Sequence, residues 1–229
     1  MDRHDDGRID GHEPNRARSL KWTDVPGWFS AEDAEALGAL LDRVPDGGLV
    51  VEVGVAFGRT TVMIGNRTEG RGIRVVSIDH FRGNSSPGDA AFQIYRDRGQ
   101  RNVIGQVIDN VVHANMRERH VLMITDSVQA ASVFGKETID LVFIDADHTD
   151  EAVEADILAW TPKVKWKGTL CGHDWNGQPG NTARRMLGDV MKHDAGVWHV
   201  TDPVEALHDE MIRRKHAFRR ADGSLILHD

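Results

Sequence analysis

The sequence predicts an α/β fold in which helices cover both faces of a doubly wound, mainly parallel sheet. Apolar runs without polar alternation are typical of strands buried on both faces, and they recur at 49–53, 75–78, 121–124, 139–144 and 169–171. Segments with apolar residues at helical spacing separate these runs. Most runs end in an acid or a glycine, at the edge of the sheet where such folds bind ligands.

The first helix and strand are signalled by a cap and a turn. Ser30 is a helix N-cap followed by acids, and the helix it starts packs on the sheet through Ala34, Leu37 and Leu41. The turn at 46–48 then leads into the strand at 49–53.

A glycine-spaced turn follows this strand. Gly54 and Gly58 allow a sharp turn and close approach to a ligand, and the helix from Arg59 to Gly65 directs free N–H groups at that ligand. The dinucleotide fingerprint is not met, because Ala56 and Arg59 occupy its second and third glycine positions. A nucleotide-like ligand is predicted, and a tight turn without a ligand is the alternative.

The second and third strands end in further acids. Asp79 closes the second strand about 20 residues beyond the glycine turn, the distance at which such folds place a ribose-binding carboxylate. The alternative is an acid that only starts a turn. The irregular segment 81–99 is a candidate substrate lid. After a helix at 102–117, the third strand leads to Asp126 and Ser127. These two residues could contact a ligand at this edge of the sheet, but a cap for a helix at 128–134 explains them equally well.

The fourth and fifth strands deliver the densest chemistry. The run at 139–145 ends in Asp145, with Asp147 and His148 directly beyond it. A helix with Val153, Ile157 and Trp160 on one face follows. A turn at 167–168 then leads into the fifth strand, 169–172, and His173, Asp174 and Trp175 follow directly after it.

The glycine turn and the five strand ends together resemble the class I S-adenosylmethionine-dependent methyltransferases over about residues 27–175, with Ala56 where many members have glycine. The resemblance implies a Rossmann-like, seven-stranded sheet with an antiparallel terminal hairpin, and S-adenosylmethionine as cofactor. The positions it implies for cofactor binding are Glu52, Gly54, Val55, Ala56, Gly58, Thr60, Asp79, His80, Asp126, Ser127, Val128 and Asp145.

The last two strand ends resemble the small-molecule O-methyltransferases of catechol, caffeoyl-coenzyme A and macrolide or aminocoumarin sugars, which hold a divalent metal beside the donor. A cation such as Mg²⁺ prefers oxygen ligands and lowers the pKa of a hydroxyl. By resemblance Asp145 and Asp174 are metal ligands, but Trp175 occupies the third ligand position. Asn176 or His173 could complete the site, or the acids could bind substrate hydroxyls directly.

Two neighbouring side chains are candidates for the catalytic base. By resemblance Asp147 falls on a catalytic carboxylate, and His148 has an ordinary pKa suited to proton removal; Asp147 is preferred. The alternatives are that Asp147 or Thr149 caps the following helix and that His148 lies at the surface. His173 and Trp175 are assigned to the substrate wall, with core packing as the alternative.

The rest of the chain is less informative. An amphipathic helix over 183–191, a strand at 197–200 and a terminal hairpin over 217–227 are expected. Residues 1–19 form a charged tail, and residues 20–229 form a single domain.

Composition limits the function classes. A formal net charge of −8 argues against nucleic-acid binding, and no apolar run is long enough to cross a membrane. The single cysteine, Cys171, excludes an internal disulfide and agrees with a reducing cytoplasm. Class I methyltransferases often dimerise, but no exposed seam is legible.

The preferred function is methylation of a small-molecule hydroxyl in a sugar, phenol or natural-product scaffold, assisted by metal. Two alternatives stay open: a metal-independent N- or O-methyltransferase on the same scaffold, and a non-catalytic nucleotide-binding protein that keeps the fold.

Overall fold

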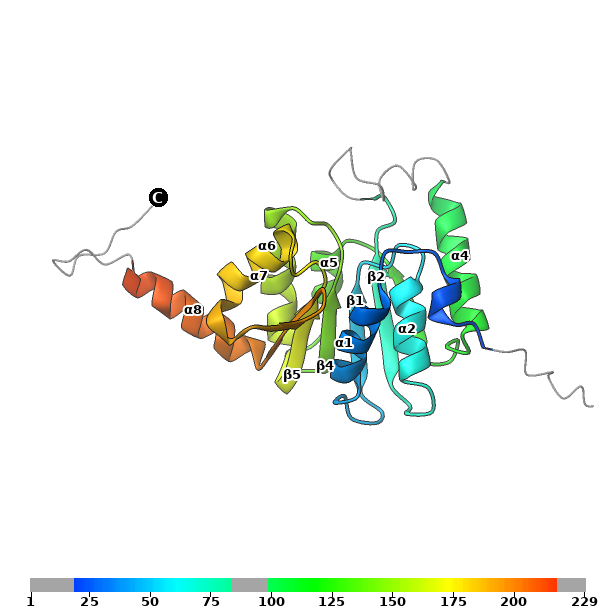
Figure 1. Cartoon of the computed structure of the whole chain (residues 1–229), viewed down its shortest axis with the longest axis horizontal. Helices are drawn as coiled ribbons and strands as arrows, with labels where there is room; N and C mark the ends of the chain where they lie inside the picture. Colours follow the sequence, from blue (N-terminus) through cyan, green and yellow to red (C-terminus); the bar gives the residue numbers. More distant parts are fainter. Residues whose placement is uncertain (1–18, 84–98, 218–229) are drawn as a thin grey trace, which may run out of the picture.

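A single seven-stranded sheet organises the computed structural model, which describes residues 19–83 and 99–217 (Figure 1). The strand order is β3-β2-β1-β4-β5-β7-β6. The first five strands run parallel, whereas β7 is antiparallel to β5 and β6 is antiparallel to β7. The mainly parallel sheet predicted from the apolar runs is confirmed. The strands are β1 (Leu49–Val53), β2 (Arg74–Asp79), β3 (His120–Ile124), β4 (Ile139–Ile144), β5 (Val164–Gly172), β6 (Lys192–Asp194) and β7 (Val197–Thr201).

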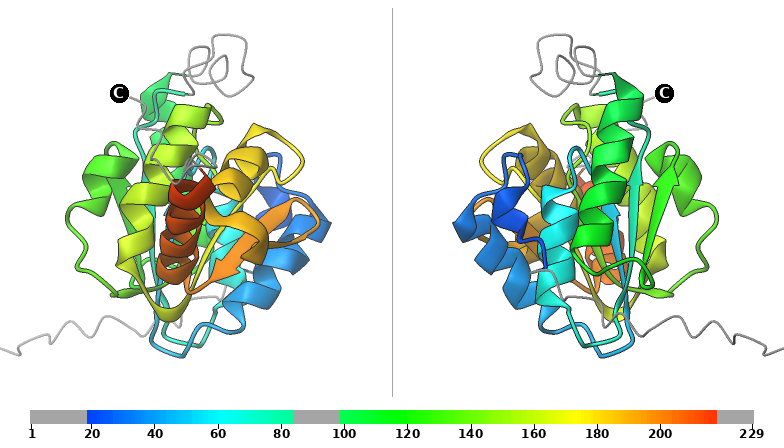
Figure 2. Two further views of the ribbon diagram at one scale, coloured as in Figure 1. Left: turned by 90° about the vertical axis from the view of Figure 1, so that its left-hand side faces the viewer. Right: turned by 90° about the vertical axis from the view of Figure 1, so that its right-hand side faces the viewer.

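Helices form a layer on each face of this sheet (Figure 2). One buried apolar cluster joins α1 (Ala31–Leu41), α2 (Arg59–Arg67) and α4 (Gln100–His113) to the sheet. A second cluster on the other face includes α5, α6, α7 and α8. Their bounds are α5 (Ser127–Ala131), α6 (Asp150–Trp160), α7 (Gln178–Leu187) and α8 (Pro203–Ala217), and the short 3₁₀ helices are η1 (Trp22–Asp24), η2 (Thr161–Lys163) and η3 (Gly188–Val190).

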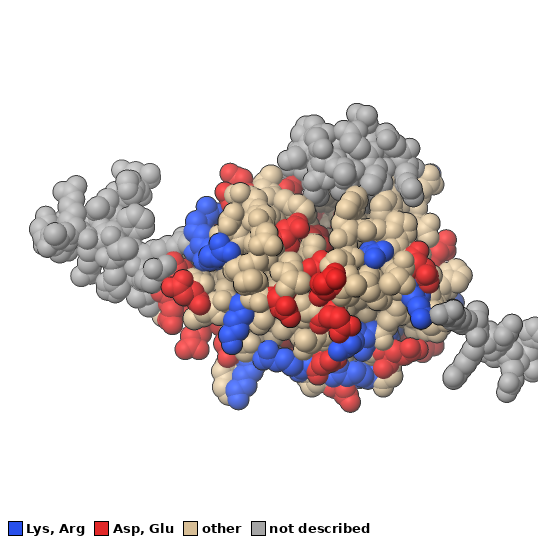
Figure 3. Space-filling view, viewed as in Figure 1, with Lys and Arg blue, Asp and Glu red and all other residues tan. Residues whose placement is uncertain are grey.

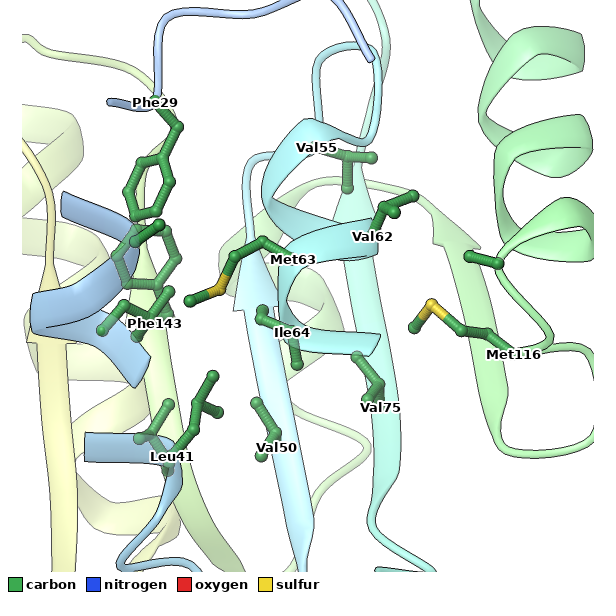
Figure 4. Close-up of a cluster of buried hydrophobic side chains, with 14 of the residues drawn as sticks. Phe29, Leu41, Val50, Val55, Val62, Met63, Ile64, Val75, Met116 and Phe143 are labelled. Carbon is green, nitrogen blue, oxygen red and sulfur yellow. The ribbon is translucent and has the colours of Figure 1, made fainter. Parts of the chain in front are cut away.

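The first cluster fixes the helices over β1, the central strand of the site (Figure 4). Leu41 of α1 and Ile64 of α2 are fully buried, as are Val50 of β1 and Phe143 of β4. Burying each such side chain contributes about 1.5–3 kcal/mol, so these contacts hold α1 and α2 firmly against β1 and β4.

Side-chain caps start three of the helices. The Ser30 hydroxyl accepts from the backbone N–H of Asp33, and the Asp33 carboxylate accepts from the N–H of Ser30, which together form a capping box. Asp126 caps α5 and Thr149 caps α6 through their side-chain oxygens. The cap expected at Ser30 is confirmed, and those at Asp126 and Thr149 match the alternatives noted for these positions.

In the C-terminal third, the structure differs from the elements expected from the sequence. Lys167 does not lie in a turn before β5; it lies within β5 at a φ of 62°, beside a shift in the register between β4 and β5. The antiparallel pair at the end of the sheet is β6 with β7, and α8 follows it. Of the hairpin expected at 217–227, only Ala217 is described, as the last residue of α8.

Parts of two other expectations fall outside the described residues. These are the charged tail, except for Ser19, and residues 84–98 of the candidate lid. Within the described part of the chain, no helix combines the length and apolarity needed to span a bilayer. On the face shown in Figure 3, acidic and basic side chains are interspersed.

Candidate active site

A cavity of about 690 Å³ lies at the carboxyl ends of the parallel strands. Its wall brings together residues that follow β3, β2, β1, β4 and β5, which are neighbours in that order across the sheet. The residues selected from the sequence that line it are Gly54, Val55, Ala56, Thr60, Asp79, His80, Asp126, Ser127, Val128, Asp145, Asp147, His148, His173 and Asp174. Glu52, Gly58 and Trp175 are not part of its lining.

The turn after β1 is tightly packed against the fourth strand. Gly54 has a φ of 93°, and a Cβ atom there would lie 1.9 Å from the backbone oxygen of Asp145. Gly58 has a φ of 81° and stands at the N-cap of α2. Ala56 also has a positive φ of 48°, at the position where a glycine is common in the family it resembles. Glycine at 54 is therefore required by both conformation and space.

Asp79 holds this turn in place. One carboxylate oxygen accepts from the backbone N–H groups of Val55 (2.9 Å) and Ala56 (3.1 Å), and the other accepts from the N–H of Phe81 (2.6 Å). The carboxylate also lines the cavity, where its remaining lone pairs can accept from a ligand hydroxyl. One residue thus orders the turn and offers a ligand contact.

Glu52 lies beneath the turn instead of in the cavity. It is fully buried and accepts from the hydroxyls of Thr61 and Ser77, each at 2.6 Å. Burial raises its pKa to about 8, so the carboxyl is largely protonated at neutral pH. The cofactor contact expected for Glu52 is replaced by a structural bond between β1, β2 and α2.

A polar network joins α5 to α6 at the β3 end of the cavity. The Ser127 hydroxyl donates to Asp156 (2.5 Å) and accepts from the indole N–H of Trp160 (2.9 Å). Burial raises the pKa of Asp156 to about 6, and the negative charges of Asp126 and Asp147 act in the same direction. Asp156 lines the cavity but had not been identified from the sequence.

Three side chains at the ends of β4 and β5 form a candidate cation site. The ligating atoms of Asp145, His148 and Asp174 all lie within 4.8 Å of one another. Nε2 of His148 is 3.1 Å from Oδ2 of Asp174 and 3.9 Å from Oδ1 of Asp145. Asp174 has a φ of 55°, a strained conformation that functional residues often retain. His148, considered from the sequence as a base, therefore lies where a third ligand is needed.

His173 lies behind this cluster, between three carboxylates. Its Nε2 is 3.1 Å from Asp33, and its Nδ1 is 3.3 Å from Asp174 and 3.7 Å from Asp145. Burial disfavours the charged imidazole, but the hydrogen bond and charge of Asp145, together with those of the other two acids, raise the pKa of His173 to about 9. Burial would raise the pKa of Asp145, but hydrogen bonds from His148 and His173 hold it at about 2.

Trp175 is placed away from the cavity. Its ring stacks on His193 with centroids 4.2 Å apart, and the guanidinium of Arg184 lies 4.1 Å over its centroid. The neighbouring Asn176 is exposed and is also absent from the lining. These contacts suit a packing role for Trp175 between α7 and β6.

Four wall or support residues had not been identified from the sequence. Trp28 lines the cavity and is 58% exposed, and Arg59 donates to the carbonyls of Val25 and Phe29, holding the segment that carries Trp28. Asp33 and Asp156 are buried acids within amphipathic helices. Asp33 belongs to the capping box at Ser30, but that motif does not reveal its contact with His173. No local motif marks Trp28, Arg59 or Asp156.

A comparison with known protein families matches the part of the chain that forms the site. A family model described as a methyltransferase domain matches residues 51–175, more than half of the chain and the whole stretch from the glycine turn to Trp175. The chain belongs to the methyltransferase-domain family. The resemblance to class I S-adenosylmethionine-dependent methyltransferases, drawn from the glycine turn and the strand ends, is confirmed at the level of family and fold.

Solved structures agree with this methyltransferase fold. A protein from Corynebacterium glutamicum aligns with a TM-score of 0.56 at 13% identity, over 79% of this chain and 84% of that one. An S-adenosylmethionine-dependent O-methyltransferase from Thermotoga maritima aligns with a TM-score of 0.53 at 11% identity, over 77% of this chain and 66% of that one. The calicheamicin methyltransferase CalS11 aligns with a TM-score of 0.50 at 16% identity, over 76% of this chain and 80% of that one. This methyltransferase thus spans just under two thirds of the Thermotoga protein.

Proposed function

We propose that this methyltransferase transfers the methyl group of S-adenosylmethionine to a hydroxyl of a small molecule, with a divalent cation held by Asp145, His148 and Asp174. One observation carries the proposal: the glycine turn with Asp79 and the Asp145 cluster open into the same cavity. A donor and an acceptor bound in one cavity can meet without domain movement.

The order of the strands supports a position for the donor. Asp79 is suited to the ribose hydroxyls, because it is an acid at the end of the second strand of a nucleotide-binding α/β fold. The turn from Gly54 to Ala56 lies between Asp79 and Asp145 across the sheet. A donor held at Asp79 and extended over this turn brings its methyl group toward the cluster.

The donor set of the cluster fits a divalent cation. Two carboxylates and one imidazole are ligands that Mn²⁺, Fe²⁺ and similar cations accept, and carboxylates also suit Mg²⁺. The cluster is half-buried, which leaves room for an acceptor oxygen beside it. When bound, the cation supplies positive charge that favours loss of a proton from an acceptor hydroxyl.

Asp147 is the proton acceptor in this proposal. It lines the cavity, and its Oδ1 accepts from the backbone N–H of Thr149 at 2.9 Å, which orients the carboxylate. The acceptor oxygen forms a bond to the methyl carbon as the bond from carbon to sulfur breaks and sulfur takes the electron pair. The hydroxyl proton passes to Asp147, and S-adenosylhomocysteine leaves.

A second candidate is methyl transfer to oxygen or nitrogen without a metal. The position of His173 favours it, because an imidazole N–H placed 3.3 Å from Asp174 and 3.7 Å from Asp145 already supplies a partner for both carboxylates. The acids then position the acceptor directly.

The metal dependence of product formation separates these candidates, and calorimetry tests the donor binding that both require. S-adenosylhomocysteine is titrated into chelator-treated protein, and the protein is then incubated with S-adenosylmethionine and a panel of sugars, phenols and natural-product alcohols. Methylated product is measured by mass spectrometry with and without Mg²⁺ or Mn²⁺. We expect donor binding without metal and product formation only with it. Equal product in chelator selects the second candidate, and absence of donor binding overturns both.

A further inference from the structure

Asp156 is a buried acid in the wall of the proposed donor cavity, and unlike the other acids of that wall it lies on a helix and not at the end of a strand. It belongs to the inner face of α6, is only 4% exposed and still lines the cavity. A buried carboxyl is costly unless it is paired, and its one hydrogen bond that the structure defines comes from Ser127. A second polar atom of the same side chain is therefore available to recognise a ligand.

The strand order places this wall at one end of the donor. If the ribose is at Asp79 on β2 and the methyl group faces Asp145 on β4, the nucleobase must lie on the other side of Asp79, toward β3. Ser127 and Val128 follow β3, and Asp156 contacts Ser127. The base end of the cavity is therefore the part that α5 and α6 enclose.

The hydrogen bonds fix which way the Asp156 carboxyl faces. An indole N–H can only donate, so the bond from Trp160 makes the Ser127 oxygen an acceptor. The Ser127 proton must then go to Oδ1 of Asp156. This directional chain leaves Oδ2 as the remaining acceptor of the carboxylate.

We propose that Asp156 recognises the 6-amino group of the donor's adenine, with Trp160 and Ser127 as positioning residues. The proposal rests on the proposed use of S-adenosylmethionine. Val128, Ala152 and Ala155 also line the cavity, the last two on the same helix as Asp156. Their side chains are apolar and mostly small, so they offer a flat base space and no competing polar group. Asp126 is less suited, because it is exposed to solvent, where water competes for its hydrogen bonds, whereas Asp156 is buried.

The test compares two nucleosides that differ at one position of the base. S-adenosylhomocysteine has an amino group at C6, whereas S-inosylhomocysteine has a carbonyl oxygen there. Both are titrated calorimetrically into the wild-type protein and into Asp156→Asn. In the variant, Ser127 still donates to the amide oxygen, so the amide N–H₂ replaces Oδ2. Glu151→Gln, an exposed change on the same helix, is the matched control.

We expect the wild type to prefer the adenosyl compound by about tenfold or more, the effect of a hydrogen bond to a charged group. Asp156→Asn removes or inverts this preference, and Glu151→Gln retains it. An unchanged ratio in Asp156→Asn overturns the proposal while donor binding stands. Failure of the wild type to bind either compound overturns the proposed function itself.

A second variant, Ser127→Ala, tests the positioning role of Ser127 without changing the Asp156 carboxyl. Ser127→Ala keeps the carboxyl but removes the bond that orients it, so the preference is expected to narrow. Thermal unfolding is recorded for each variant to confirm a folded state. A Ser127→Ala protein that discriminates as strongly as the wild type contradicts the positioning role.

Discussion

The carboxylate of Asp79 accepts hydrogen bonds from the backbone N–H groups of Val55 and Ala56, so the end of β2 holds the turn that follows β1. The same carboxylate faces the donor cavity. Under the proposed function, donor contact and loop structure both depend on this side chain, and substitutions there are expected to affect both.

Asp79→Ala is expected to lower the affinity for S-adenosylhomocysteine by at least about tenfold and the free energy of unfolding by about 2–3 kcal/mol, because backbone N–H groups lose a charged partner. Calorimetry and urea unfolding measure the two effects. The control is Asp46→Ala, which breaks an exposed ion pair with Arg71 and is expected to cost under about 1 kcal/mol. Equal effects of the two changes contradict the dual role.

Gly54→Ala is expected to lower the free energy of unfolding by roughly 3–5 kcal/mol, the sum of left-handed strain and overpacking. The new Cβ would meet the backbone of Asp145. Gly70→Ala is the matched control, since Gly70 has a φ of 77° but no atom within 4 Å of an added Cβ. Its cost is expected to be about 1–2 kcal/mol. Urea unfolding of both variants separates conformation from contact, and equal costs would rule out the clash.

Asp174→Asn and His148→Ala are each expected to weaken Mn²⁺ binding by at least about tenfold, since the first removes a negative charge from the candidate site and the second removes its imidazole ligand. The free Mn²⁺ signal in electron paramagnetic resonance gives the affinity directly, without turnover. His208→Ala, an exposed histidine of α8, is the control. If only the Asp174 change weakens binding, His148 is not a ligand.

Glu52→Gln is expected to flatten the pH dependence of stability. The pKa of Glu52 is raised by burial to about 8 in the folded protein, so folding favours the protonated form. Its contribution to stability is complete below the ordinary pKa of about 4.5 and is lost as the pH rises through about 8. Glutamine can still accept from Thr61 and Ser77. Urea unfolding from pH 5 to 9 measures the difference between the proteins, and parallel curves would refute a raised pKa.

Much of the fold could be predicted because each parallel strand leaves a continuous apolar run. The carboxyl ends of adjacent strands meet at one edge, so Asp79, Asp145 and Asp174 could be assigned to one site before their distances were known. The extent of β5 could not, because its Lys165–Lys167 stretch is partly exposed and polar.

The supporting residues could not be predicted, since long-range packing selects them. Asp33 reaches the N–H of Gly196, which is 163 positions away in the chain, and Asp156 contacts Ser127 across 29 positions. Asp33 has a local role in the capping box at Ser30, which does not reveal this distant contact, and Asp156 has no local motif. His148 was identified by its chemistry, but its proximity to Asp174 depends on how β4 and β5 end side by side.

The close approach of Gly54 to the backbone of Asp145 joins the two halves of the cavity mechanically. The turn after β1 lies directly against the backbone of Asp145, so a shift of one is expected to move the other. If the donor binds at the turn and the acceptor at Asp145, as proposed, occupancy of one half of the cavity is expected to change the free energy of binding in the other, and such linkage is reciprocal. Donor and acceptor are therefore expected to bind cooperatively, and the affinity for either one reports on the presence of the other.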